Sequence, residues 1–437
     1  MRRRHHHHEG LLGALVRVAW GRRLETTLAL AATGARLVMW NTAGVRVGSG
    51  LLAVAAGGLV CHAPTRRALV RRSVGQARER WFARGIASTE LFDPRHAPEL
   101  VDVQATRGGF ALQLRLSPRV TTEDLASASE RLAVAFGARA VRVTRDPAHA
   151  GRACMVVLYA DPLSHELSWP WAGYGPLDLW QSIPFGYDED GEAAWLSLAE
   201  HHVLIGGEPG AGKSNALSLL VAAAAADPSV ELWLFDGKLV ELARWSPVAK
   251  RFVGSDVTEA IVALEELRLC MAERYERLLA EGLNKIRPGL GMGLVLVVID
   301  ELVLYLGGPK AQREAFAEAL RDLVARGRAA GIVVVAATQK PSADAVPSGI
   351  RDLFGYRLAL RCTTRDASDT ILGGGWASLG YSAADVDAAT RGVGWWRGEG
   401  TVPRRIRCFR MDDDTVAWAQ DSAVRIRVDA GRSKDPS

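Results

Sequence analysis

The carboxyl-terminal half of the chain alternates short, unbroken apolar runs with longer segments that repeat their apolar residues at helical spacing. The runs that we interpret as strands span residues 202–205, 230–235, 294–299, 332–337 and 356–360. The third and fourth read LVLVVI and IVVVAA, which is typical of strands covered by helices on both faces. The pattern therefore predicts an α/β fold with a mainly parallel sheet.

A second pattern, with a period of two residues, lies upstream. Apolar and polar positions alternate on both sides of Gly108 and Gly109, which predicts a β-hairpin that turns at the glycine pair. Thr121, followed three positions later by Asp124, is a helix-start signal, and two more strand-like runs follow before residue 160. These elements together predict a small α/β module.

Composition divides the chain into four parts. The linker SWPWAGYGPLD at residues 168–178 is rich in Pro, Gly and aromatic residues and indicates a boundary. The polar end of the chain, from about Asp421, is expected to be loose. We assign residues 1–84 to a basic amino-terminal region, 85–170 to the small α/β module, 171–411 to a larger α/β domain and 412–437 to a polar tail.

The amino-terminal region holds two apolar stretches, at about residues 26–40 and 47–63. The second has no Asp, Glu, Lys or Arg and is near the lower length limit for a transmembrane helix. Arginines flank the pair on both outer sides, so the positive-inside rule predicts a transmembrane hairpin with both ends cytoplasmic. We therefore expect the rest of the chain on the cytoplasmic side of the cell membrane. Arg36 and Arg46 favour the alternative, an amphipathic hairpin on protein or on the membrane surface.

Charge is distributed unevenly along the chain. Residues 1–84 hold 15 Lys and Arg against 3 Asp and Glu, whereas the remainder holds 39 against 46. The net charge of +5 comes from residues 1–84, so it does not indicate that the remainder of the chain is a basic, nucleic-acid-binding domain. Any DNA contact of the remainder must come from local basic loops. The five cysteines have no paired spacing, which supports neither a zinc site nor a disulfide framework.

The strongest chemical signal is GEPGAGKS at residues 207–214, which matches the pattern G-x-x-x-x-G-K-[ST]. It lies between a predicted strand and a predicted helix, where backbone N–H groups and the helix amino terminus can surround phosphates. Lys213 would reach the β- and γ-phosphates of ATP, and Ser214 would bind Mg²⁺. The predicted nucleotide-binding residues are Gly207, Glu208, Pro209, Gly210, Ala211, Gly212, Lys213, Ser214 and Asn215.

Polar residues end two of the predicted strands. Asp300 and Glu301 follow the run at residues 294–299, and the carboxyl end of a buried strand faces the ligand crevice of such sheets. We expect Asp300 to hold Mg²⁺ and Glu301 to polarise the attacking water. The alternative is a pair of acids that cap the next helix. Thr338 and Gln339 end the following strand, where Gln339 could sense the γ-phosphate.

Five ordered motifs resemble the FtsK/SpoIIIE family of DNA translocases. They are the pattern at residues 207–214, FDGKLVEL at 235–242, IDEL at 299–302, the segment at 328–341 that contains RAAGI and ATQKP, and TILG at 370–373. The likeness covers roughly residues 99–411, the small module included. It implies a RecA-like P-loop NTPase that forms a homo-oligomeric ring, usually a hexamer. Such a ring encircles double-stranded DNA and moves it while hydrolysing ATP.

The resemblance also implies roles for basic residues. A ring ATPase normally completes its site with an arginine from the neighbouring subunit. Arg326, Arg328 and Arg351 are the candidates near the crevice end of the sheet, and we take Arg328 as the catalytic one, although each could be a solvated helix charge. The segment GLNKIRPG resembles a pore loop in which Lys285 and Arg287 would contact DNA phosphates. The alternative is an ordinary basic surface turn.

Three departures limit what the resemblance implies. Gly237 stands where the family often has proline between Asp and Lys, and Asp369 stands where an arginine commonly precedes Thr-Ile-Leu. Only about 25 residues follow the last predicted strand, so we expect no winged-helix domain there. A compact motor of this kind, anchored to a membrane, resembles the actinobacterial plasmid-transfer proteins, which move duplex DNA between mycelial cells.

These observations predict a membrane-anchored, ATP-dependent double-stranded DNA translocase for conjugative or plasmid DNA transfer. One alternative is a secretion-type ATPase of the same superfamily that acts on protein substrates. Such ATPases usually carry several motor domains, and this chain has one. A second alternative is a nucleotide-binding membrane scaffold, against which Glu301 argues because a scaffold has no need of a water-polarising acid.

Overall fold

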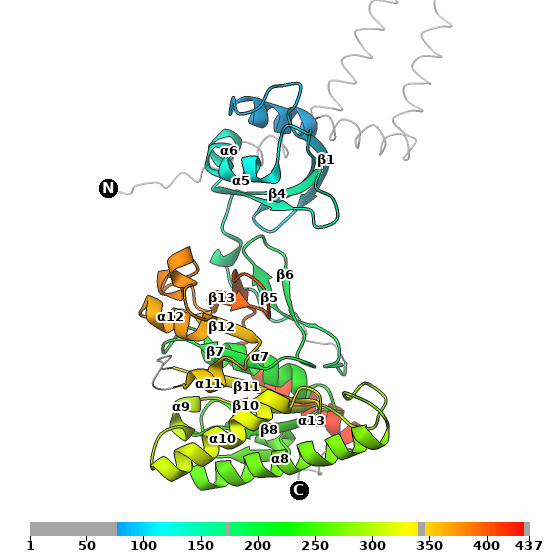
Figure 1. Cartoon of the computed structure of the whole chain (residues 1–437), viewed down its shortest axis with the longest axis vertical. Coiled ribbons are helices and arrows are strands. Elements are labelled where there is room, and N and C mark those ends of the chain that lie inside the picture. The colour runs from blue at the N-terminus through cyan, green and yellow to red at the C-terminus, as the bar shows by residue number, and fades with distance from the viewer. Residues whose placement is uncertain (1–76, 171–174, 340–345, 432–437) are drawn as a thin grey trace, which may run out of the picture. The chain divides into compact units, whose positions relative to one another are not determined.

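The computed structural model describes residues 77–170, 175–339 and 346–431 (Figure 1). The chain divides into two compact units, residues 1–100 and 101–437. In the described part of the first unit a helix spans residues 77–87 and buries Phe82 and Ile86. The predicted hairpin at residues 26–40 and 47–63 lies outside the described residues. Within the described ranges, no helix combines the length and the apolar character that crossing a membrane requires.

The small α/β module is a four-stranded sheet with two short helices. Its strand order is β1-β2-β4-β3, and both β2 and β3 pair antiparallel with β4. The predicted hairpin lies between β1 and β2, and a Cβ on Gly109 would come within 1.8 Å of the Val157 carbonyl oxygen. Thr121 and Asp124 form the predicted capping box. The elements are β1 (Glu99–Ala105), β2 (Gly109–Arg115), α5 (Thr122–Ser127), α6 (Ser129–Phe136), β3 (Ala140–Arg145) and β4 (Arg152–Leu158).

The larger domain is built on a ten-stranded mixed sheet. The order is β6-β5-β14-β13-β12-β7-β11-β10-β8-β9, in which the strands from β12 to β9 are parallel and the others antiparallel. The predicted mainly parallel sheet is thereby confirmed. The strands are β5 (Ile183–Asp188), β6 (Ala193–Leu196), β7 (Val203–Gly206), β8 (Glu231–Phe235), β9 (Arg251–Val253), β10 (Val295–Ile299), β11 (Ile332–Thr338), β12 (Tyr356–Leu360), β13 (Val393–Arg397) and β14 (Arg404–Cys408).

Helices cover both faces of this sheet, which explains the unbroken apolar runs. Alternate strand residues divide between two cores: Val298 packs with α7 and α13, whereas Val297 packs with α8 and α10. The α helices are α7 (Lys213–Ala225), α8 (Val257–Ala280), α9 (Leu302–Tyr305), α10 (Lys310–Arg326), α11 (Ser348–Arg351), α12 (Arg365–Leu372) and α13 (Asp413–Asp429). The 3-10 helices are η2 (Pro162–Ser164), η3 (Ala243–Val248), η4 (Ala377–Leu379) and η5 (Ala383–Asp385).

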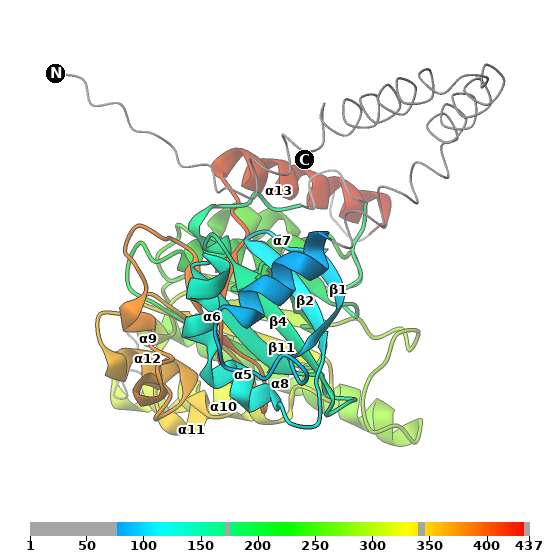
Figure 2. The ribbon, with the colours of Figure 1, turned by 90° about the horizontal axis from the view of Figure 1, so that it is seen from above.

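The end of the chain is ordered further than its sequence suggested. The expectation of a loose tail from Asp421 is wrong for the described residues, because α13 runs as one helix to Asp429. It lies alongside α7 (Figure 2) and buries Ala419, Ala423 and Arg427. Composition alone missed this helix because its apolar face is narrow and one of its buried residues is an arginine.

Candidate functional site

The P-loop, residues 207–214, lies between a strand and a helix, as its pattern predicted. Strand β7 ends at Gly206, the loop follows, and α7 begins at Lys213. Gly210 and Gly212 have φ angles of +80° and +107°, which residues with a side chain rarely adopt. A Cβ on Gly212 would also lie 2.7 Å from the Gly392 nitrogen. The tight loop points the amino terminus of α7, with its free N–H groups, at the site where phosphates would bind.

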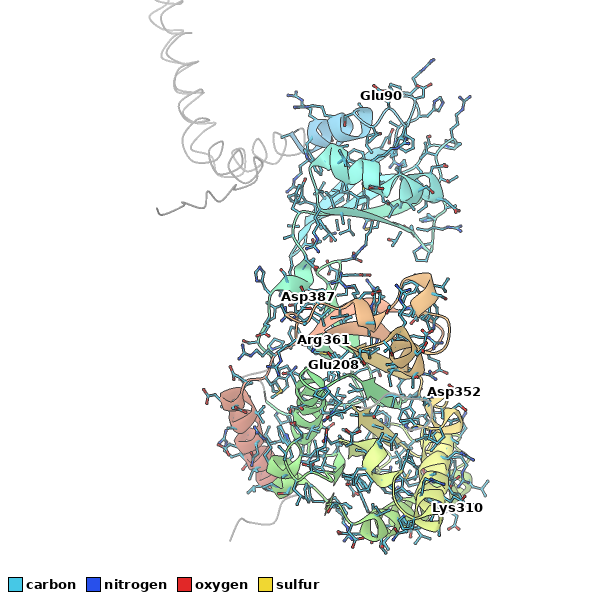
Figure 3. All side chains as sticks on the ribbon, turned by 90° about the vertical axis from the view of Figure 1, so that its left-hand side faces the viewer. Glu90, Glu208, Lys310, Asp352, Arg361 and Asp387 are labelled. Carbon is cyan, nitrogen blue, oxygen red and sulfur yellow. The ribbon has the colours of Figure 1, made fainter. Side chains whose placement is uncertain are left out.

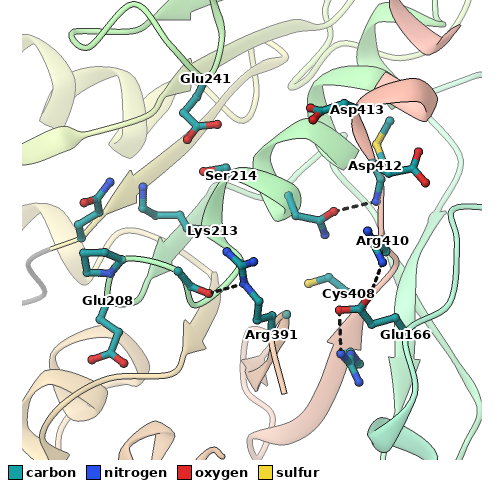
Figure 4. A pocket seen from close by; sticks show the side chains of 18 residues that line it. Glu166, Glu208, Lys213, Ser214, Glu241, Arg391, Cys408, Arg410, Asp412 and Asp413 are labelled. Carbon is teal, nitrogen blue, oxygen red and sulfur yellow. Dashed lines mark hydrogen bonds and ion pairs between the residues drawn. The ribbon is translucent and has the colours of Figure 1, made fainter. Parts of the chain in front are cut away.

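The P-loop lines an open cavity of about 750 Å³ (Figure 4). Its walls come from the P-loop, from the loop after β8, from the end of β11, from the segment before β13, and from the end of β14 with the residues that follow it. The lining is strongly polar, as a site for a charged ligand requires. The lining residues are Glu166, Glu208, Pro209, Gly210, Gly212, Lys213, Ser214, Asn215, Glu241, Gln339, Arg391, Gly392, Arg407, Cys408, Arg410, Met411, Asp412 and Asp413.

Asp300 lies beside the P-loop lysine. It follows β10, its side chain is fully buried, and its Oδ1 lies 3.5 Å from Lys213 Nζ. Burial raises the pKa of this carboxyl above its ordinary value, although the Lys213 ammonium opposes the shift. Its Oδ2 has no hydrogen-bond partner among the described residues. A buried carboxylate oxygen without a partner is suited to a divalent cation, so the site fits the predicted magnesium ion.

Glu301 is held by the end of the neighbouring strand. The Gln339 backbone N–H lies 3.2 Å from each of the Glu301 carboxylate oxygens, and Lys238 Nζ lies 3.4 Å from Oε2. In the amide orientation that satisfies its neighbours, Gln339 Oε1 accepts hydrogen bonds from Lys238 at 2.7 Å and from Lys213 at 3.2 Å. The predicted residues Lys213, Glu301 and Gln339 therefore meet at one place. Lys238 belongs to the family motif at residues 235–242, and its position here is not evident from that motif.

Asn215 uses its side chain to join the P-loop helix to the end of the sheet. Its Nδ2 donates to the Phe409 carbonyl at 2.7 Å, and its Oδ1 accepts from the Met411 backbone N–H at 2.8 Å. Both atoms are engaged in protein contacts, yet the residue lines the cavity. Asn215 thus fixes the segment between β14 and α13 as a wall of the site.

Two arginines that the sequence pattern did not single out contact the P-loop. Arg391, in the segment before β13, donates from Nε to the Gly210 carbonyl at 3.0 Å. Arg361, which follows β12, forms an ion pair with Glu208 (Figure 3). Both come from distant parts of the chain and belong to no local motif. Only the sheet order, which places β12 beside β7, brings them to the loop.

Glu166, two residues before the predicted linker, also reaches the cavity. Glu166 accepts hydrogen bonds from Arg410 at 2.8 Å and from Arg407 at 3.2 Å (Figure 4). The Arg410 backbone completes the attachment by donating to the Leu167 carbonyl and accepting from the Trp169 N–H. A residue just before the predicted linker, and not the linker itself, therefore forms part of the site wall.

The predicted arginine candidates lie at the opposite ends of the parallel strands, near their amino termini. The P-loop follows the carboxyl end of β7, whereas Arg326 and Arg328 precede β11 and Arg351 precedes β12. The expectation that they lie near the crevice end is wrong for this reason. Arg326 pairs with Asp322, Arg328 lies 3.2 Å from a Glu399 carboxylate oxygen, and Arg351 donates to the Thr370 carbonyl.

The two predicted DNA-binding residues also lie near the amino-terminal ends of the parallel strands. Lys285 and Arg287 are exposed in the segment before β10, and the buried Ile286 between them fixes the segment to the domain. Lys285 forms an ion pair with Glu200, which precedes β7. Their exposure fits a surface that contacts phosphates, and it fits an ordinary basic turn equally well.

Residues 179–294 match the model of the FtsK/SpoIIIE family, and residues 37–155 match that of the actinomycete conjugal transfer protein N-terminal domain. The resemblance that the motifs indicated is thereby confirmed. DNA translocase FtsK of Bacillus cereus is 30% identical over 257 residues, which are 54% of this chain and 31% of that protein. DNA translocase SftA of Bacillus subtilis is 30% identical over 205 residues, or 43% and 21% of the two chains. The chain thus spans a third or less of these curated relatives.

Two solved structures share the fold. The pCW3 conjugation coupling protein TcpA superposes with a TM-score of 0.52 at 18% identity, over 80% of this chain and 99% of that one. The ATPases 2 and 3 of EssC from Geobacillus thermodenitrificans superpose with a TM-score of 0.51 at 15% identity, over 62% of this chain and 53% of that one. At these identities the likeness establishes the α/β P-loop fold.

Proposed function

We propose that this chain, whose residues 179–294 match the FtsK/SpoIIIE family, is an ATP-driven motor that moves double-stranded DNA. The observation that carries the proposal is the convergence of Lys213, Asp300 and Glu301 at the carboxyl edge of the parallel sheet, beside an open polar cavity. A protein that only binds nucleotide needs the lysine. The two acids supply what hydrolysis needs in addition.

Each residue has a role that its position permits. The P-loop N–H groups and Lys213 would bind the phosphates, and Ser214 with Asp300 would hold Mg²⁺, which neutralises phosphate charge. Glu301 would accept the proton of the attacking water, because its nearly buried carboxylate is held by Gln339, which lines the cavity. An arginine of a neighbouring subunit, for which Arg328 is our candidate, would complete the site in a ring of six chains.

Duplex DNA is the substrate that the relatives favour. The two curated relatives described above are DNA translocases, and the match at residues 37–155 is to a domain of conjugal transfer proteins. We therefore place the motor in conjugative or plasmid DNA transfer. A protein substrate, which the secretion-type alternative would use, is the outcome that the experiment has to exclude.

Hydrolysis by a fragment that begins at Trp81 tests the motor. We expect linear duplex DNA to stimulate it strongly and Lys213→Ala to abolish it, since the P-loop lysine contacts the transferred phosphate. The measurement is phosphate release with and without DNA, with retained secondary structure in the variant as the control. Activity in the variant within about 3-fold of wild type, under ~1 kcal/mol in barrier, would contradict the proposed site. Activity indifferent to DNA would favour a protein substrate.

We also propose that the hairpin at residues 26–40 and 47–63 anchors the motor to the cell membrane, on the strength of its apolar sequence and flanking arginines. The full chain should remain in the membrane pellet after extraction with alkaline carbonate, whereas the fragment from Trp81 should not. Release of the full chain by carbonate would indicate the surface-bound hairpin instead.

A further inference from the structure

The loop after β8 is built around a buried carboxylate. Asp236 is fully buried, and its side chain accepts hydrogen bonds from the backbone N–H groups of Leu242 at 2.8 Å, and of Lys238 and Ala243 at 3.2 Å each. The loop is therefore fixed at both ends by one side chain. This gives Lys238 a defined starting point at the carboxyl edge of the sheet.

The same loop packs directly against the helix that follows Glu301. A Cβ on Gly237 would lie 2.8 Å from the Leu304 side chain of α9, so the Leu304 side chain packs against the backbone of residue 237 where a side chain would otherwise lie. Leu239 has a φ angle of +57°, a left-handed conformation that residues with a side chain rarely adopt. Strained backbone of this kind persists only where the surroundings impose it, and it is most common at functional sites.

Lys238 links the proposed catalytic carboxylate to the P-loop lysine. Its Nζ lies 3.4 Å from Glu301 Oε2 and 2.7 Å from Gln339 Oε1, which in turn lies 3.2 Å from Lys213 Nζ. The Glu301 side chain is 10% exposed, whereas that of Lys238 is 39% exposed. The lysine thus contacts a nearly buried carboxylate from the solvent side. An ion pair between two fully exposed side chains would contribute little, but here one partner is almost buried.

We propose that Lys238 is a positioning residue for Glu301. The single backbone N–H of Gln339, shared between both carboxylate oxygens on one side, and the ammonium of Lys238 on the other leave the carboxylate a single orientation. A general base held in this way needs no reorganisation when water attacks. Lys238 acts through Glu301, because it does not line the nucleotide cavity, whereas Lys213 and Gln339 do. This inference rests on the proposed hydrolytic function.

The test compares substitutions in the full-length protein. Lys238→Met should lower kcat about 10-fold, since misplacing a reacting group by about an ångström costs a rate factor of this order or more. The Kd for Mg²⁺ and the non-hydrolysable imido analogue of ATP should stay within about 2-fold, because that binding uses the P-loop. Lys238→Arg should restore part of kcat, since it keeps the charge. Lys250→Met, the same change at an exposed position before β9, should have no effect.

Coupling to Glu301 separates positioning from a general structural role. Glu301→Gln should remove most hydrolysis, and adding Lys238→Met should then lower kcat no further. A normal kcat in Lys238→Met would overturn the proposal. So would a further loss in the double variant, or a loss of analogue affinity as large as the loss of rate, because the lysine would then act on the nucleotide itself.

A measurement without turnover keeps this inference distinct from the proposed function. If the wild-type protein hydrolyses no ATP with or without DNA, the proposed function fails. The thermal unfolding midpoints of the wild type, the two single variants and the double variant then show whether Lys238 and Glu301 interact. Shifts that are not additive would support the interaction. Additive shifts would show that the two side chains act independently, and would overturn the inference as well.

Discussion

At the scale of single residues, burial determines which groups can do chemistry. Asp300 and Lys213 are buried together. Burial raises the pKa of the Asp300 carboxyl, and the Lys213 ammonium offsets only part of that shift. His202, before β7, is buried as well, and burial lowers its pKa to about 3. It therefore stays neutral and accepts the Val334 N–H at 2.9 Å, which is a structural role. Exposed groups such as Lys285 and Arg287 are accessible to a binding partner.

Replacing Lys285 and Arg287 together by alanine should weaken the response to DNA. The double variant should show less DNA-stimulated hydrolysis. The slope of log DNA affinity against log salt concentration should become shallower by about 0.9 for each phosphate that the variant no longer binds. The measurement is stimulated turnover across a salt series. The ion pair of Lys285 with Glu200 should not mask the effect, because both partners are exposed and the pair contributes little.

The matched control removes the same charge elsewhere. Lys310→Ala with Arg313→Ala, both exposed on α10, should leave stimulation and salt slope unchanged. Equal losses in the two double variants would mean that net charge alone matters, and would reject the pore-loop assignment.

At the scale of elements, α13 supports the P-loop helix at both ends. Near its start, Met411 and Phe409 bind Asn215 in the first turn of α7. Near its end, the buried Arg427 donates to four backbone carbonyls around the last turn of α7 and the turn before β8. The last helix of the described residues therefore supports the helix that begins at the P-loop.

Removing that guanidinium should loosen the domain. We expect Arg427→Met to reduce stability by about 3 kcal/mol, because several buried carbonyls lose their donor at once. The chemical denaturation midpoint of the fragment from Trp81 measures the change. Arg425→Met, on the exposed side of the same helix, is the control and should shift the midpoint little. Similar shifts for the two variants would show that the buried contacts contribute nothing particular.

At the scale of the whole molecule, the parallel sheet separates two sets of functional candidates. The nucleotide site lies at the carboxyl edge, while Arg326, Arg328, Lys285 and Arg287 lie at the amino edge. An arginine at the amino edge of its own chain is too far along the sheet to serve its own P-loop. It can act only on another copy, as the head-to-tail contacts of a ring permit.

Mixing two inactive variants tests this arrangement. Lys213→Ala supplies the arginine without a working site, and Arg328→Ala supplies the site without the arginine. Random equimolar rings of the two should regain about a quarter of the wild-type active sites, because an intact P-loop must meet an intact neighbour. The readout is DNA-stimulated hydrolysis. No recovery with Arg328→Ala, but recovery with Arg326→Ala or Arg351→Ala, would assign the role to that residue.

The sequence by itself determined the parallel core, the P-loop and the two strand-end acids. Local patterns suffice there, because a short apolar run followed by an acid favours a buried strand that ends at a ligand crevice. It also indicated the family, since several motifs in order are far more specific than one. The hairpin at Gly108 and the cap at Thr121 were predictable for the same reason, namely that each depends on residues a few positions apart.

Only the tertiary structure decided what depends on strand order. It brought Arg361 and Arg391 to the P-loop and made Glu166 part of the cavity wall. It also put the predicted arginines at the amino-terminal ends of the parallel strands. These contacts join residues separated by more than a hundred positions, and no local pattern records them. It also turned an apparently loose tail into α13, since a helix with a narrow apolar face forms when packing supplies what propensity does not.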